Sequence, residues 1–130
     1  MRVQILIVED EQIVAADLEA KLIRMGHQVA GIAASAEEAF AMAARHCPDL
    51  ILMDIQLQGN LNGLEAARQL QQLCTAQIIF VTAFAAVFRK DPNRMKLPGI
   101  CLTKPFSAPQ LQAALQAALH EKAHGRAPSS

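Results

Sequence analysis

Acidic side chains gather directly after two of the most apolar segments of the chain. The aliphatic run of residues 5–8 is followed by Glu9, Asp10 and Glu11, and Asp54 ends a second run of the same kind. Like charges this close repel by about 1 kcal/mol or more per pair at an effective dielectric constant near 20. The chain must therefore supply a cation at this place, or bind one.

The apolar pattern predicts strands that alternate with helices. Aliphatic runs of strand length, typical of strands buried on both faces, lie at residues 4–8, 28–33, 50–54, 77–82 and 99–102. Segments with apolar residues at helical spacing lie at residues 11–25, 35–45, 63–73 and 107–120. Ser35 and Ser107 each stand three residues before a Glu or Gln, which predicts that they cap their helices.

A fourth helix is expected over residues 84–96, but this segment contains Pro92. Proline inside a helix costs about 3 kcal/mol or more, because it removes a hydrogen bond and crowds the preceding turn. Asp91 and Pro92 would suit a helix that begins there instead. We therefore expect this helix to be short, broken or late in starting.

This alternation predicts an α/β fold, in which a doubly wound five-stranded parallel sheet carries helices on both faces. A length of 130 residues suits one domain, which we place at residues 1–120. Residues 121–130 are polar and end in Pro-Ser-Ser, so we expect a flexible tail or a linker stub there.

Composition argues against several classes of protein. The 12 basic and 12 acidic side chains cancel, so bulk charge favours neither nucleic acid nor a membrane surface. No apolar run is long enough to span a bilayer, and the N-terminus does not resemble a signal peptide. The three cysteines show no metal-binding spacing and suit reduced thiols. A cytoplasmic location is expected.

Five residues whose side chains could take part in a reaction or bind a ligand fall at predicted strand ends. Ligands of open parallel sheets bind beyond the carboxyl ends of the strands. The residues at those ends are Glu9, Asp10, Asp54, Thr82 and Lys104. Three carboxylates and one ammonium leave a charge of −3 + 1 = −2, which one divalent cation would balance. Oxygen ligands favour a hard ion, so the sequence predicts a Mg²⁺ site.

A carboxylate beside a divalent cation, with a hydroxyl and an ammonium opposite, suits phosphoryl transfer. Asp54 is the best candidate for a nucleophile that forms an aspartyl phosphate. A nucleotide- or flavin-binding domain would need a glycine-rich turn after the first strand, and none is present. A phosphatase of similar topology would need a second acid two residues after Asp54, where the chain has Gln56.

Four motifs in this order resemble the receiver domain of two-component response regulators: ILIVEDE, LILMDIQL, IIFVTAF and CLTKPF. The resemblance covers about residues 3–120. It implies the flavodoxin-like (βα)5 fold with strand order 2-1-3-4-5. It also implies a cytoplasmic signalling module of a phosphorelay, not an enzyme in the usual sense. The alternative is a pseudo-receiver that is not phosphorylated and acts only through protein interactions.

The resemblance also implies roles for the residues around the acceptor. Asp54 would take a phosphoryl group from a phosphohistidine on a sensor histidine kinase or a histidine phosphotransfer protein. Asp10 and Asp54 would bind Mg²⁺, and Glu9 would act on it through water. The backbone carbonyl of Gln56 would be a further ligand. The domain itself would bind neither nucleic acid nor membrane.

The switch implied by the resemblance involves the last two strands. Thr82 and Lys104 would bind phosphoryl oxygens and move toward them, and a cis bond is expected between Lys104 and Pro105. Cys101 stands at the switch position where the family usually has Tyr or Phe. The surface formed by the fourth helix, fifth strand and fifth helix would be the interaction face, with homodimerisation as one option.

Overall fold

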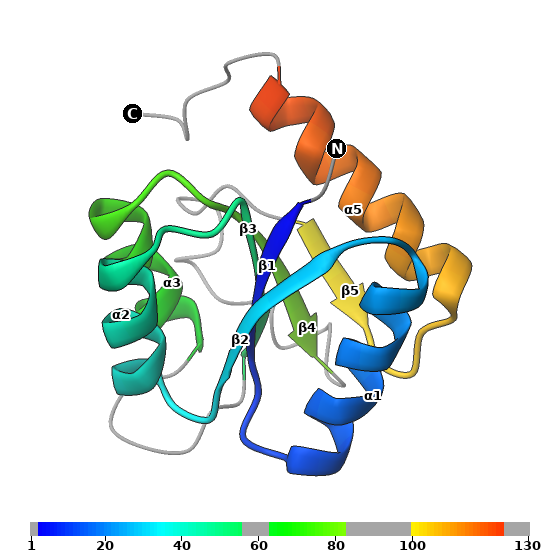
Figure 1. Ribbon diagram of the computed structural model, residues 1–130, viewed down its shortest axis with the longest axis horizontal. Coiled ribbons are helices and arrows are strands. Elements are labelled where there is room, and N and C mark those ends of the chain that lie inside the picture. Colours follow the sequence, from blue (N-terminus) through cyan, green and yellow to red (C-terminus); the bar gives the residue numbers. More distant parts are fainter. Residues whose placement is uncertain (1–2, 56–62, 83–99, 124–130) are drawn as a thin grey trace.

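The fold is a five-stranded parallel sheet flanked by helices, and the computed structural model describes residues 3–55, 63–82 and 100–123 of it (Figure 1). The strand order is β2-β1-β3-β4-β5, which confirms the order implied by the family resemblance. The strands are β1 (Gln4–Val8), β2 (Gln28–Ala33), β3 (Leu50–Asp54), β4 (Gln77–Thr82) and β5 (Ile100–Thr103).

Four helices lie in the described part of the chain: α1 (Gln12–Arg24), α2 (Ala36–Arg45), α3 (Gly63–Leu73) and α5 (Ala108–Ala123). The predicted end of the last helix at residue 120 is too early, since the helix continues to Ala123. Glu, Lys and Ala at residues 121–123 favour helix, and Gly125 is the first residue that disfavours it. The predicted fourth helix with Pro92, and residues 124–130, lie outside the described residues.

Helices α1 and α5 cover one face of the sheet, and α2 and α3 cover the other (Figure 1). Successive residues of a strand point to opposite faces, so the central strands β1, β3 and β4 need apolar residues on both faces. In β1, Leu6 and Val8 pack toward α2 and α3, whereas Ile5 and Ile7 pack toward α1 and α5. This arrangement explains why the strands appear in the sequence as unbroken aliphatic runs.

Local signals fix where the helices begin and end. The Glu38 backbone N–H donates to Ser35 Oγ over 3.2 Å, and the Gln110 N–H donates to Ser107 Oγ over the same distance. The Ser107 N–H donates in return to Gln110 Oε1 at 2.8 Å, which completes the predicted capping box. After α1, Gly26 adopts a positive φ of 89°, which glycine allows without steric cost.

Candidate functional site

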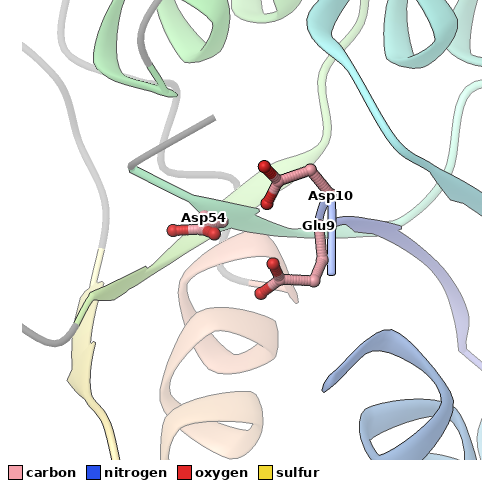
Figure 2. A group of neighbouring side chains, drawn as sticks. All are labelled: Glu9, Asp10 and Asp54. Carbon is pink, nitrogen blue, oxygen red and sulfur yellow. The ribbon is translucent and has the colours of Figure 1, made fainter. Parts of the chain in front are cut away.

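The carboxyl ends of the strands bring the predicted acidic residues together. Glu9 and Asp10 directly follow β1, and Asp54 is the last residue of the neighbouring strand β3. Figure 2 shows that the three carboxylates turn toward one another. One oxygen of each lies within 4.8 Å of an oxygen of the other two. The site is therefore a compact group of carboxylates at the carboxyl ends of the neighbouring strands β1 and β3.

Burial makes this group electrostatically costly. Glu9 is 3% exposed and Asp54 is 5% exposed, while Asp10 is partly exposed. Two unit charges about 4.8 Å apart repel by roughly 3 kcal/mol at an effective dielectric constant near 20. Water cannot screen the two buried carboxylates well. The group therefore favours any cation that can reach it.

Lys104 supplies one positive charge to this group. Its Nζ lies 3.0 Å from Glu9 Oε1 and 3.8 Å from Asp54 Oδ2. Burial by itself lowers the pKa of the Lys104 ammonium. The hydrogen bond to Glu9 and the charges of Asp54, Glu9 and Glu11 act in the other direction and prevail, so the pKa lies above its ordinary value of 10.5. Lys104 is therefore held in its charged form.

Glu9 has a larger structural role than the sequence alone suggested. Its Oε1 accepts the hydrogen bond from Lys104, and its Oε2 accepts one from the Glu11 backbone N–H at 3.1 Å. Glu11 itself is exposed, begins α1 as its N-cap residue and does not join the carboxylate group. Glu9 thus ties the start of α1 to the ammonium of Lys104. The only sign of this linking role in the sequence was that Glu9 stands two residues before the predicted start of the helix at residue 11.

The other predicted residues lie around the same edge. Thr82 ends β4 with 2% exposure, and its carbonyl oxygen accepts a hydrogen bond of 2.8 Å from the Lys104 backbone N–H. Cys101 pairs with Phe80 in the sheet and packs against the core on the α2 and α3 side. The peptide bond between Lys104 and Pro105 is cis, as expected. Gln56 lies outside the described residues.

The carboxylate group fits a Mg²⁺ ion. Opposite ligands of an octahedral Mg²⁺ site are about 4.2 Å apart, so oxygens within 4.8 Å of one another need to move little, or to share a water. Asp10 is more available than Glu9, because Lys104 and Glu11 already occupy both oxygens of Glu9. The donor set is oxygen only, which suits Mg²⁺ better than zinc.

Residues 5–116 match the sequence family described as the response regulator receiver domain. The chain belongs to this family. Its relatives therefore place it among the response regulators of two-component signalling. Within the described residues, no helix has the length and apolar character needed to cross a membrane.

Individual relatives agree with this assignment. The chain is 37% identical over 120 residues to the phyllosphere-induced regulator PhyR of Methylorubrum extorquens, which covers 92% of this chain and 44% of that protein. It is 32% identical over 116 residues to the transcriptional regulatory protein PdtaR of Mycobacterium tuberculosis, covering 89% of this chain and 56% of that one. The chain thus spans about half the length of these curated relatives.

Solved structures show the same fold. The anti-anti-sigma factor PhyR from Bartonella quintana superimposes with a TM-score of 0.84 at 35% identity, over 96% of this chain and 50% of that one. The receiver domain of a modulated diguanylate cyclase from Desulfovibrio desulfuricans superimposes with a TM-score of 0.85 at 34% identity, over 97% of this chain and 100% of that one.

Proposed function

We propose that this receiver domain accepts a phosphoryl group on Asp54 in a Mg²⁺-dependent reaction. The donor is a phosphohistidine of a sensor histidine kinase or a histidine phosphotransfer protein. The observation that carries the proposal is the meeting of three carboxylates and one ammonium at a single sheet edge. Phosphoryl transfer depends mainly on positioning and charge neutralisation, which is what such a group provides.

The proposed step exchanges one bond of phosphorus for another. An oxygen of Asp54 attacks the phosphorus, the P–O bond forms, and the P–N bond to imidazole breaks. The imidazole nitrogen keeps the electron pair of the broken bond and takes up a proton from solvent. A bound Mg²⁺ would supply Lewis-acid charge for the phosphoryl oxygens. Asp10 and Asp54 would hold the ion, with the Gln56 carbonyl as a further proposed ligand.

Lys104 and Thr82 have separate proposed tasks. Lys104 is 3.8 Å from Asp54 but only 3.0 Å from Glu9, so in this state it neutralises Glu9 first. A phosphoryl group raises the charge at Asp54 to roughly −2, which would draw the ammonium away from Glu9. The buried hydroxyl of Thr82 would then donate to a phosphoryl oxygen. Because the Lys104 N–H is bonded to Thr82, β4 and β5 would respond together.

This response is the proposed output. The described part of the output face is formed by β5 and α5, which would meet a partner protein or a second copy of the chain. We propose a cytoplasmic signalling role in which the domain is a phosphoacceptor and not a turnover enzyme. The name of the Bartonella relative, an anti-anti-sigma factor, suggests one kind of output that this domain could control.

Two observations favour a second candidate, the pseudo-receiver that binds partners without phosphorylation. Both carboxylate oxygens of Glu9 already have partners, and Lys104 is nearer to Glu9 than to Asp54. In addition, Cys101 replaces the aromatic residue expected at the switch position. A domain that is held in one state by these contacts would need no phosphoryl group.

The test is phosphorylation by acetyl phosphate with Mg²⁺, followed by intact-protein mass spectrometry. The wild-type chain should gain the mass of one phosphoryl group, and Asp54→Asn should gain none. The matched control is Asp49→Asn, the same substitution just before the opposite end of β3. It should be phosphorylated like the wild type. A wild-type chain that stays unmodified with its fold intact would support the pseudo-receiver instead.

A further inference from the structure

A groove of about 400 Å³ lies between α1 and the loop that follows β5. Its apolar walls are Val14, Leu18, Pro105 and Phe106. Lys104 also lines it, so the groove adjoins the carboxylate site. Two further charged side chains, Asp17 and Lys21, complete its wall.

Lys21 reaches across this groove to the loop. Its Nζ lies 5.6 Å from the centroid of the Phe106 ring, within the range of a cation–π interaction. The same Nζ lies 2.7 Å from Asp17 Oδ2, one helical turn away on α1. The Lys21 side chain is 25% exposed, so its contact with the ring is partly shielded from water. Lys21 is thus directed at Phe106 and held there by Asp17.

This contact anchors the loop that carries Lys104. On one side, the Lys104 N–H donates to the Thr82 carbonyl at 2.8 Å, which ties the loop to β4. On the other side, Phe106 lies against Lys21, which ties the loop to α1. Lys104 stands between these two anchors and directs its ammonium at Glu9 and Asp54. The position of the Lys104 ammonium therefore depends on both contacts.

We propose that Lys21 is a positioning residue for Lys104 and acts through the ring of Phe106. The proposal rests on the phosphoryl transfer to Asp54 proposed above, and it assigns to α1 a part in aiming the ammonium. Loss of the Lys21 charge removes one of the contacts that hold the loop against α1. Lys104 then spends less time where it can neutralise the transferred group, and positioning of that kind strongly affects rate.

The first experiment compares three variants in transfer from acetyl phosphate with Mg²⁺. Lys21→Met keeps most of the aliphatic stem and should lower the rate constant at saturating donor about threefold, the scale of one partly exposed cation–π contact. The donor concentration at half-saturation should not change. Lys21→Arg should restore the rate. Arg24→Met, which removes the other basic residue of the last turn of α1, should behave as wild type.

A second experiment reads the anchor without any phosphorylation. Amide hydrogen exchange of Lys104 should be faster in Lys21→Met, because its N–H is part of the loop that loses an anchor, whereas amides in β1 and β3 should exchange as before. Phe106→Leu should have the same effect. The double variant Lys21→Met/Phe106→Leu should lose no more rate than either single variant, as expected for one shared contact.

The outcomes separate this proposal from the proposed function. Additive losses in the double variant, an equal loss in Arg24→Met, or unchanged Lys104 exchange in Lys21→Met would overturn the role of Lys21. A wild-type chain that takes up no phosphoryl group would overturn the proposed function, and Lys104 exchange would still decide whether Lys21 anchors the loop.

Discussion

The two ends of the parallel strands use acidic side chains in opposite ways. The amino edge is where the strands begin, and the carboxyl edge is where they end. At the amino edge, Asp49 Oδ2 accepts a hydrogen bond of 2.9 Å from the Gln4 backbone N–H, and the Asp49 carbonyl accepts one from the Gln77 N–H. This acid links β1 to the start of β3 and β4. At the carboxyl edge, three carboxylates lie together and two of them are buried, and the Lys104 ammonium pairs with Glu9 and Asp54.

The contrast shows which edge is built for stability and which for binding. The acid at the amino edge has partners within the sheet and leaves little for a ligand to improve. The group at the carboxyl edge keeps a net charge of −3 + 1 = −2 when no ion is bound. This uncompensated repulsion destabilises the fold unless a cation binds there. Groups of charges that destabilise a fold in this way are typical of functional sites.

The largest expected effect comes from removing the only cation of the described carboxyl-edge group. Lys104→Met should lower the free energy of unfolding by about 2–3 kcal/mol at neutral pH without Mg²⁺, because buried Glu9 loses its charged partner. Urea unfolding in the presence of a chelator measures this value. A variant as stable as the wild type would show that the repulsion is small and that the contrast between the edges fails.

The pH dependence of the same pair of proteins sharpens this prediction. The pKa of Lys104 is raised above 10.5 in the folded state, so its stabilising effect is complete below the unfolded value and is lost as pH rises through the folded one. The difference in unfolding free energy between wild type and Lys104→Met should therefore be constant near neutral pH. It should shrink only in alkaline solution above 10.5.

A smaller effect of opposite sign is expected for Asp10→Asn. The substitution removes one of the three repelling charges, but Asp10 is partly exposed, so water already screens its charge better than those of the two buried acids. The free energy of unfolding should therefore rise by only about 1–2 kcal/mol without Mg²⁺. With Mg²⁺ at about ten times its dissociation constant, the wild type should gain about 1.4 kcal/mol and the variant almost none.

Thermal unfolding with and without Mg²⁺ checks this prediction. Glu37→Gln is the control, since Glu37 lies in the first turn of α2 outside the carboxylate group, and it should respond to the ion as the wild type does. An Asp10→Asn variant that is still stabilised by Mg²⁺ as strongly as the wild type would remove Asp10 from the proposed ion site.

The sequence predicted the fold more completely than the contacts of the site. Aliphatic runs such as that of β3 suit strands buried between two layers of helices, so the sheet followed from the pattern of apolar runs and their alternation with helices. The meeting of Asp10 and Asp54 followed because parallel strands end at the same edge. The pairing of Lys104 with Glu9 rather than Asp54 could not be predicted, since 0.8 Å decides it (3.8 − 3.0 Å) and side-chain packing sets that difference.

Contacts between distant segments were the other gap. Nothing in the sequence linked Lys21 to Phe106, because the contact exists only after α1 and α5 pack on the same face of the sheet. The end of α5 was also predicted too early, because residues 121–123 were counted with the polar tail although Glu, Lys and Ala favour helix. Patterns along the chain therefore predict elements well and tertiary contacts poorly.

The smallest expected effect tests the amino edge. Asp49→Ala removes the acceptor of the Gln4 N–H, which β1 would otherwise satisfy only with water, and should lower the free energy of unfolding by about 1 kcal/mol. Neither Mg²⁺ stabilisation nor phosphorylation of Asp54 should change, because Asp49 lies at the opposite edge of the sheet. Urea unfolding with and without Mg²⁺ measures both parts. If Asp49→Ala weakened the response to Mg²⁺ as Asp10→Asn does, the two edges would be coupled, and the assignment of stability to one and binding to the other would have to be abandoned.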